Sequence, residues 1–121
     1  MINTKAPTSI LLVDDDPYFL SELSDLTLYI QAEVFPFLYP ADAIMFAKNH
    51  VVNVLVTDFS MADIDGVTLA NEVLLLHKNA MIIVISGNDV NKEKWVNTWH
   101  FLRKPLDLDI LIQCLRTLGT M

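Results

Sequence analysis

Cysteine is almost absent from this sequence, since Cys114 is the only one among 121 residues. A single thiol excludes an intramolecular disulfide and is typical of proteins in the reducing cytoplasm. Basic residues are also scarce: 8 Lys and Arg stand against 15 Asp and Glu, and the net charge is −7. Because phosphate backbones are bound by clusters of Lys and Arg, this balance argues against nucleic acid as a direct partner.

Long apolar runs are missing as well. No segment approaches the ~20 apolar residues that a membrane-spanning helix needs, and residues 1–9 lack the apolar stretch of a secretory signal. The chain is nevertheless 53% hydrophobic, without an internal repeat, a low-complexity stretch or a linker. Its length suits one packed domain. We therefore expect a single cytoplasmic domain over residues 1–121, with a core from residue 9 to residue 119, no output domain and no membrane partner.

Apolar runs and helical patterns alternate along the chain. Runs typical of strands lie at residues 9–13, 33–37, 51–57, 81–85 and 100–103. Helical periodicity covers residues 17–30, 41–49, 67–77, 91–99 and 107–118. Pro36 lacks an amide donor, which favours an edge position for its strand. Five strands alternating with five helices predict an α/β fold, namely a doubly wound, five-stranded parallel sheet with the flavodoxin-like strand order 2-1-3-4-5.

Other residues fit structural roles. Asp16 precedes Pro17 and is expected to cap the first helix. Asp107 and Asp109 fall in the first turn of the last helix, and Gly119 follows its end. The tryptophans and methionines are expected to pack, and the histidines to be surface or hydrogen-bonded residues. These residues are Trp95, Trp99, Met45, Met61, Met81, His50, His77 and His100.

Polar side chains follow four of the predicted strands at their carboxyl ends, where doubly wound sheets bind ligands. They are Asp14, Asp15 and Asp16 after the first strand, Asp58 after the third, Ser86 after the fourth and Lys104 after the fifth. Carboxylates brought together raise one another's pKa unless a cation relieves the repulsion, and oxygen ligands suit Mg²⁺. With a hydroxyl and an ammonium beside them, they match the needs of phosphoryl transfer to a carboxylate.

Five separated motifs contain these residues. They are the acidic pair Asp14-Asp15 within Leu12–Pro17, the loop Asp58–Gly66, the dipeptide Ser86-Gly87, the aromatic residue Phe101 and the dipeptide Lys104-Pro105. In type and order they resemble the motifs of the response-regulator receiver domains of two-component phosphorelay signalling, including the chemotaxis regulators. The resemblance covers essentially the whole chain, and it implies a cis peptide bond between Lys104 and Pro105.

The resemblance implies how a phosphoryl group would be taken up. Asp58 would accept it from a sensor histidine kinase, a phosphotransfer protein or a small donor such as acetyl phosphate. Asp15 and Asp58 would bind Mg²⁺ directly, with Mn²⁺ as a substitute. Asp14 would act directly or through water, and Ser60 through its backbone carbonyl.

The resemblance also implies a switch. Ser86 and Lys104 would bind phosphoryl oxygens, and Ser86 would move toward the phosphate while Phe101 enters the space that is vacated. Ser60 and Asn88 would tune the lifetime of the aspartyl phosphate. The surface that responds would comprise residues 91–118, and it would contact a downstream protein or a second copy of the chain.

The last helix is amphipathic, and its two faces bear on that surface. Its core face is expected to consist of Leu108, Leu111, Ile112 and Leu115. Ile110 and Cys114 fall roughly opposite and are expected to form an exposed apolar pair for a partner. Two scattered apolar residues without any function are nearly as good an interpretation.

Three departures from the family pattern stand out. Ala62 occupies a position where the family usually has proline, which should loosen the loop after Asp58. Residues 98–100 (Thr-Trp-His) replace the usual Gly-Ala turn, so the helix at residues 91–99 is expected to be short or irregular. The spacing from Ser86 to Lys104 is also somewhat short. These departures concern the output surface more than the chemistry.

Two alternatives stay open. A pseudo-receiver would fold identically but signal by protein contact alone; its usual mark is loss of the acceptor or of the lysine, and both Asp58 and Lys104 are present. A haloacid-dehalogenase-type phosphatase would use Asp14 and Asp16 as an Asp-x-Asp motif, but that motif wants Thr or Val where this chain has Tyr18. We expect a switch that catalyses only its own phosphorylation and dephosphorylation, and no enzyme acting on a separate substrate.

Overall fold

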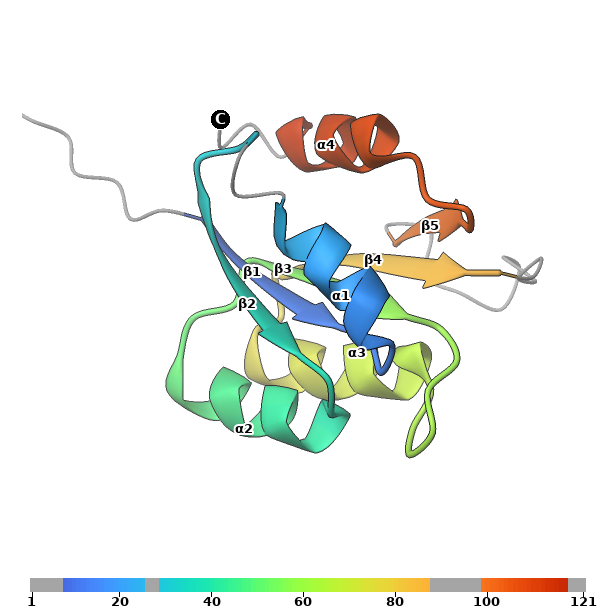
Figure 1. The fold of residues 1–121 in the computed structure, drawn as a ribbon. Coiled ribbons are helices and arrows are strands. Elements are labelled where there is room, and N and C mark those ends of the chain that lie inside the picture. The colour runs from blue at the N-terminus through green and yellow to red at the C-terminus, as the bar shows by residue number, and fades with distance from the viewer. Residues whose placement is uncertain (1–7, 26–28, 88–98, 118–121) are drawn as a thin grey trace, which may run out of the picture.

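The computed structural model describes residues 8–25, 29–87 and 99–117, and Figure 1 shows their arrangement. In this part of the chain five parallel strands form one sheet in the order β2-β1-β3-β4-β5. The strands are β1 (Thr8–Val13), β2 (Ala32–Phe37), β3 (Val54–Asp58), β4 (Met81–Ser86) and β5 (His100–Arg103). The predicted sheet and strand order are confirmed, and β2 with its Pro36 lies at an edge.

Helices cover both faces of the described sheet (Figure 1). One face carries α1 (Pro17–Ser24) and α4 (Leu108–Arg116), and the other carries α2 (Pro40–Asn49) and α3 (Gly66–Leu76). No one of these four helices is long and apolar enough to cross a membrane. The helix expected at residues 91–99 lies outside the described residues, apart from Trp99, which is buried as expected and belongs to no helix.

Strand β1 shows how the sheet divides the core in two. Ile10 and Leu12 point into the core under α1 and α4, whereas Leu11 and Val13 point into the core over α2 and α3. All five residues of β3 are buried, including Asp58 at its end. Burying one such apolar side chain stabilises a fold by roughly 1.5–3 kcal/mol. The strands therefore form a rigid frame that fixes the positions of the residues at their carboxyl ends.

Two elements have other bounds than the sequence predicts. The first helix ends at Ser24, although the apolar pattern continues to Ile30. Ile30 is buried all the same, because a loop residue fills that position of the core. Strand β3 begins at Val54 and not at residue 51, since Asn53 is engaged with Ser9: its Oδ1 accepts a hydrogen bond from the Ser9 N–H at 2.8 Å. Apolar patterns report burial, which loop residues supply as well.

Aspartates cap three of the helices. Asp16 Oδ1 accepts a hydrogen bond from the backbone N–H of Tyr18 at 3.0 Å, so the predicted cap of α1 is confirmed. Asp65 Oδ1 accepts from the Thr68 N–H at 2.8 Å and caps α3. Asp107 is the cap of α4 and not a residue of its first turn. Each cap contributes about 1 kcal/mol and fixes where the chain leaves the preceding loop.

Two expectations about packing are wrong. Met45 is 58% exposed and does not pack in the core, whereas Met61 and Met81 are half-buried against it. Cys114 is half-buried against the core under α1 and α4, so only Ile110 of the expected exposed pair is exposed. The reason is helical geometry: residue 114 lies three positions after Leu111 and shares its buried face.

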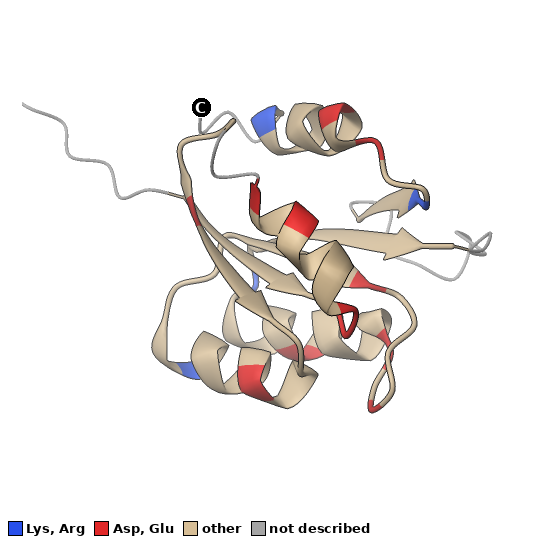
Figure 2. Cartoon of the chain, in the orientation of Figure 1, with Lys and Arg blue, Asp and Glu red and all other residues tan. Residues whose placement is uncertain are grey.

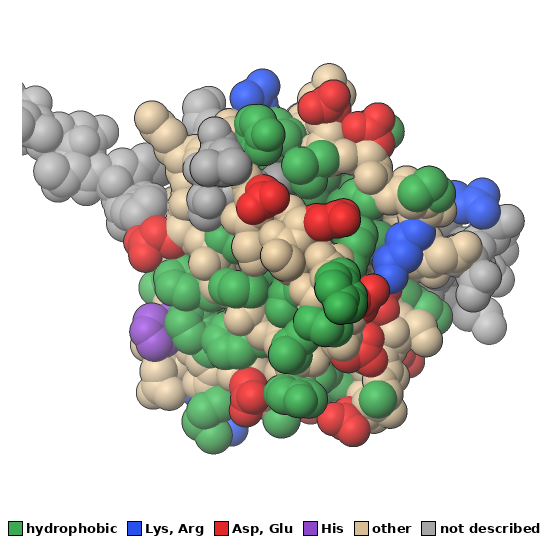
Figure 3. All heavy atoms as spheres, viewed as in Figure 1, with side chains coloured by type: hydrophobic (Ala, Val, Ile, Leu, Met, Phe, Trp, Pro, Cys, Tyr) green, Lys and Arg blue, Asp and Glu red, His purple; other side chains and the backbone are tan. Residues whose placement is uncertain are grey.

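The histidines have local partners in the fold. His77 Nε2 lies 2.7 Å from the Ala47 carbonyl oxygen, and the His50 ring stacks on Phe46 with 4.1 Å between ring centroids. Phe46 also contacts Phe35 and Phe37 of β2, which joins α2 to the edge strand. Figure 3 shows hydrophobic side chains spread over the surface near α2 and β2. The expectation of surface or hydrogen-bonded histidines is confirmed for His50 and His77.

Candidate functional site

The register of the parallel strands brings the predicted site residues together. Val13 of β1 is aligned with Thr57 of β3, so Asp14 and Asp58 follow at neighbouring strand ends. Asp58 is in turn aligned with Ile85, which places Ser86 one residue further along β4. The aligned pair Ser86 and Arg103 is then followed by residue 104. Four side chains from four strand ends thus meet at one edge of the sheet, as the sequence predicts.

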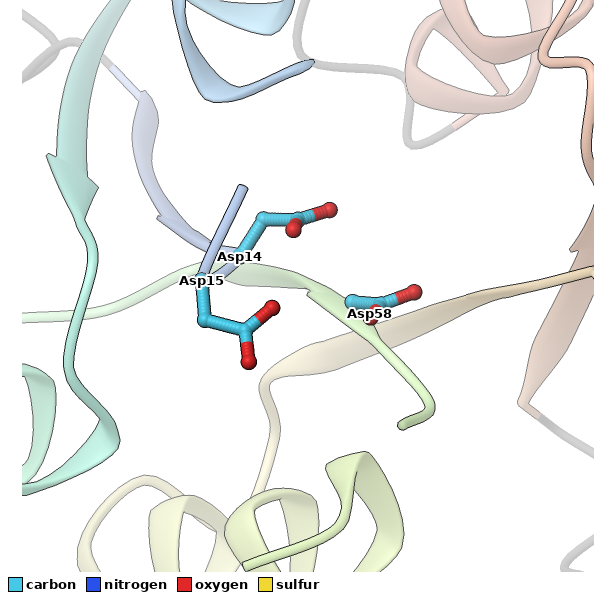
Figure 4. A group of neighbouring side chains, drawn as sticks. All are labelled: Asp14, Asp15 and Asp58. Carbon is cyan, nitrogen blue, oxygen red and sulfur yellow. The ribbon is translucent and has the colours of Figure 1, made fainter. Parts of the chain in front are cut away.

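Three carboxylates converge at this edge, and Figure 4 shows them side by side. One oxygen each from Asp14, Asp15 and Asp58 lies within 4.8 Å of the others. Asp14 and Asp58 are buried, with 1% and 7% of their surface exposed, whereas Asp15 is exposed. Figure 2 shows more acidic residues in the nearby loops. The cluster is therefore open to solvent on the side of Asp15 and closed beneath Asp14 and Asp58.

Lys104 supplies the positive charge of the site. Its Nζ lies 3.0 Å from Asp58 Oδ1 and 4.0 Å from Asp14 Oδ2. The same Nζ lies 4.8 Å from the centre of the Phe19 ring, within the range of a cation–π interaction. Burial disfavours the ammonium, but the hydrogen bond to Asp58 and the negative charges around it outweigh burial and raise the pKa of Lys104. The ammonium is therefore held beside the carboxylate of Asp58.

Asp14 is the carboxylate of the cluster whose ionised form is disfavoured by its surroundings. Its Oδ1 accepts a hydrogen bond from the Asp16 N–H at 2.9 Å, but its buried Oδ2 has no hydrogen-bond partner in the part of the chain that the structure describes. Burial, followed by the negative charge of Asp58, raises the pKa of Asp14 from 3.8 to about 6, although the Asp16 N–H and Lys104 oppose the rise. An ionised Asp14 is costly in the absence of a further positive charge.

This donor set fits a hard divalent cation. It offers three carboxylates, oxygen atoms only, and a buried oxygen of Asp14 without a hydrogen-bond partner among the described residues. Mg²⁺ and Mn²⁺ prefer such ligands. Ser60 is exposed in the loop after Asp58, where its carbonyl is the expected further ligand. The described residues thus satisfy the chemistry that the sequence predicts for a metal site.

The loop between β3 and α3 approaches Asp58 closely. The Phe59 N–H donates to the Ile85 carbonyl at 2.8 Å, and the Gly66 N–H donates to the Phe59 carbonyl at 2.7 Å. A Cβ atom at residue 66 would overlap with the Asp58 carbonyl oxygen and would lie 3.1 Å from the Phe59 Cα. Only glycine fits there without a shift of backbone. The loop that follows Asp58 is therefore folded back on it.

The structure describes Ser86, Phe101 and Pro105 of the remaining predicted residues. Ser86 is buried at the end of β4, and its carbonyl accepts a hydrogen bond from the Lys104 N–H at 2.9 Å. The peptide bond between Lys104 and Pro105 is cis, as expected. Phe101 is half-buried against the core over α2 and α3. Asn88 lies outside the described residues.

Two contributions to the site are not visible in the sequence patterns. Phe19 fits the apolar face of its helix, and nothing in that pattern indicates its contact with Lys104. The backbone N–H of Ala62 donates to Asp15 Oδ2 at 3.2 Å. A backbone donor has no signature in the residue type, except that proline would exclude it. Both contacts can be recognised only from the tertiary structure.

We expect Asp14→Asn to stabilise the metal-free protein at pH 7. The folded-state pKa of Asp14, about 6, exceeds its ordinary value of 3.8, so the stability that its neutral form provides is complete below pH 3.8 and is lost as the pH rises through 6. Asparagine stays neutral, and its side-chain oxygen can still accept the Asp16 N–H. The expected gain in the free energy of unfolding, measured by urea denaturation in EDTA, is on the order of 2 kcal/mol.

Asp16→Asn is the matched control for this prediction. Asp16 is exposed, and asparagine caps a helix as well as aspartate does, so the free energy of unfolding should change by less than about 0.5 kcal/mol. The gain from Asp14→Asn should also shrink as the pH is lowered toward 3.8. Equal stability of Asp14→Asn and the parent protein at pH 7 would contradict the electrostatic cost assigned to Asp14.

Comparison with known proteins identifies the family. The sequence profile of the response regulator receiver domain matches residues 10–116. The transcriptional regulatory protein GlrR of Escherichia coli K12 is 26% identical over 116 residues, which cover 90% of this chain and 26% of GlrR. This chain thus spans about a quarter of the length of the curated relatives it matches.

Solved structures agree with the profile. A response regulator receiver protein of Sinorhizobium medicae WSM419 superposes with a TM-score of 0.83 at 25% identity, covering 93% of this chain and 94% of that one. The receiver domain of the hybrid histidine kinase CckA gives a TM-score of 0.77 at 25% identity, covering 90% of this chain and 96% of the other. The profile spans every residue from Asp14 to Lys104, and the chain belongs to the response regulator receiver domain family of two-component systems.

Proposed function

We propose that this receiver domain accepts a phosphoryl group on Asp58 with the help of Mg²⁺ and that the modification switches a protein-binding surface. One observation carries the proposal: the buried carboxylate of Asp58 lies among two further carboxylates and 3.0 Å from the ammonium of Lys104. A carboxylate nucleophile, a cation site and a fixed positive charge are the parts that phosphoryl transfer requires.

Asp14, Asp15 and Asp58 would hold the cation, together with the carbonyl of Ser60. Receiver domains bind Mg²⁺ at such an acidic cluster, and the buried, unpartnered oxygen of Asp14 fits that use. When bound, Mg²⁺ neutralises charge on the carboxylates and on the phosphoryl oxygens. Mn²⁺ is the expected substitute, because it accepts the same oxygen ligands.

The protein's own residues account for the transfer. An oxygen of Asp58 forms a bond to phosphorus while the bond from phosphorus to the donor breaks, and the electron pair of that bond leaves with the donor. Lys104 already lies at Asp58 Oδ1, where its ammonium meets the oxygens of the incoming group. Ser86 would donate its hydroxyl to another phosphoryl oxygen. The donor is a phosphohistidine of a sensor kinase or phosphotransfer protein, or a small acyl phosphate.

The response is proposed to spread from Ser86 through its neighbours in the sheet. The Ser86 carbonyl is bonded to the Lys104 N–H, so the two phosphate-binding residues are linked through the backbone. Phe101 of β5 would move when Ser86 moves. This movement would alter the surface formed by β5, α4 and the residues that precede β5. Such a change between two arrangements is driven by a local charge. A downstream protein or a second copy of the chain would bind there.

The proposal also covers the output, the location and the partners of the domain. Because this chain spans only 26% of the curated relatives it matches, any transcriptional output belongs to those proteins. We infer a cytoplasmic receiver without direct contact to nucleic acid or membrane, in line with its single cysteine and its net charge of −7. Ser60 and Asn88 are proposed to set the lifetime of the phosphorylated form.

Acetyl phosphate tests the function directly. With Mg²⁺, intact-mass measurement should show one phosphoryl adduct per chain, which hydroxylamine removes as expected of an acyl phosphate. In EDTA the adduct should be absent, because the carboxylates would repel the donor. Absence of an adduct under both conditions would leave the pseudo-receiver as the better description. Repeated turnover of a generic phosphate ester would instead indicate the phosphatase, and either result would contradict the proposal.

A further inference from the structure

We propose that the backbone amide of Ala62 positions the carboxylate of Asp15 and thereby raises the affinity of the acidic cluster for Mg²⁺. The inference rests on the proposed function, because it concerns the same cation site. Its basis is a hydrogen bond between two segments far apart in the sequence: the Ala62 N–H donates to Asp15 Oδ2 at 3.2 Å. Ala62 touches no reacting atom and acts only through Asp15.

Asp15 is the member of the cluster that most needs such support. Asp14 and Asp58 are buried, and they are held by the Asp16 N–H and by Lys104 respectively. The side chain of Asp15 is exposed, so packing does not restrict it. Repulsion from two neighbouring carboxylates favours orientations that turn it toward solvent. The amide of the facing loop is the donor that opposes this repulsion.

The donor is itself held in place. The loop between β3 and α3 is bonded at both ends, through the Phe59 N–H to β4 and through the Gly66 N–H to the Phe59 carbonyl. Met61 and Ile64 are half-buried against the core over α2 and α3, on either side of the amide in the sequence. A donor fixed by its surroundings orients its acceptor at little further cost in entropy.

One carboxylate can serve both the amide and a cation. Asp15 Oδ2 accepts the Ala62 N–H, and an oxygen of Asp15 lies within 4.8 Å of oxygens of Asp14 and Asp58. Figure 4 shows the Asp15 carboxylate directed into the space that it shares with Asp58. An ionised carboxylate has about four acceptor positions, so the hydrogen bond leaves room for a metal ligand. The amide thus holds the third ligand in place before the cation binds.

A pair of substitutions at residue 62 tests the proposal. Ala62→Pro removes the amide hydrogen, whereas Ala62→Ser keeps it and changes the side chain by one hydroxyl. We expect Ala62→Pro to weaken Mg²⁺ binding about three- to ten-fold, the worth of one hydrogen bond, and Ala62→Ser to stay within about two-fold of the parent protein. Amide chemical shifts followed during a Mg²⁺ titration give both affinities. Unchanged or tighter binding by Ala62→Pro overturns the proposal, and so does equal weakening in both variants.

Hydrogen exchange in the metal-free protein provides a second test, which does not require the Ala62→Pro substitution. Asp15→Ala removes the acceptor, whereas Asp15→Asn keeps a side-chain oxygen. The Ala62 amide should exchange about three- to ten-fold faster in Asp15→Ala than in Asp15→Asn, while the Phe59 and Gly66 amides stay unchanged. Equal exchange at Ala62 in the two variants overturns the hydrogen bond. A parent protein that shows this bond but no Mg²⁺ binding contradicts the proposed function, so the two failures are distinguishable.

Discussion

Asp58→Asn should show no phosphoryl adduct after treatment with acetyl phosphate and Mg²⁺, and it should remain folded. The amide of asparagine is not a nucleophile of comparable strength, and no other described carboxylate lies 3.0 Å from the Lys104 ammonium. The variant also removes one of three mutually repelling charges, which limits the loss of stability from the broken ion pair. Intact mass measures the adduct, and circular dichroism measures the fold.

Asp63→Asn is the matched control for this experiment. Asp63 lies in the same loop after β3, is exposed and undergoes the same chemical change. It should form the adduct as fully as the parent protein does, since it belongs to no part of the carboxylate cluster. An adduct that persists in Asp58→Asn, or that disappears in Asp63→Asn, would refute the assignment of Asp58 as the acceptor.

Gly66→Ala should be the most destabilising single-methyl substitution in the described part of the site. The added Cβ would overlap with the Asp58 carbonyl oxygen and would press on the Phe59 Cα at 3.1 Å. These are backbone atoms in a loop bonded at both ends, so they cannot move aside as a flexible side chain does. We expect a loss of about 2–3 kcal/mol in the free energy of unfolding and a melting temperature lower by roughly 10 °C.

Gly87→Ala adds the same methyl group at the end of β4. No atom lies within 4 Å of a Cβ built at residue 87, so its melting temperature should stay within about 2 °C of that of the parent protein. The displaced Asp58 of Gly66→Ala should also react more slowly with acetyl phosphate, whereas Gly87→Ala should react normally. Similar stability of the two variants would show that the approach between Gly66 and Asp58 is looser than the structure describes.

The sheet could be predicted because its central strands are buried on both faces. The apolar runs that become β1 and β4 are short and continuous, and polar residues end them. Few elements other than a strand buried on both faces combine these features. The ends of the elements were harder to predict. Ile30 and Val52 are buried from loops, and a hydrophobic pattern does not distinguish a loop residue in the core from a helical or strand residue.

The site was predictable in its charges and not in its hydrogen bonds. Asp14, Asp58 and Lys104 are marked by their residue types and by their places after apolar runs, and the fold brings them together. The contacts of Phe19 and of the Ala62 amide depend on how two loops and a helix meet, which no local pattern encodes. Ala62, which stands where the family usually has proline, predicts a looser loop, but the sequence does not indicate that its backbone N–H donates to Asp15 Oδ2.

The fold of the loop after Asp58 limits how this protein can evolve. Residues 59–65 join two backbone segments that touch each other, because Gly66 packs directly on Asp58 and Phe59. An insertion or a deletion in this stretch would move Gly66 away from that contact and would shift the Asp65 cap of α3 with it. The side chain of Asp63 is exposed and belongs to no part of the carboxylate cluster, so it is free to change. We therefore expect descendants of this gene to differ by residue replacements in this loop, while the length of the loop stays constant.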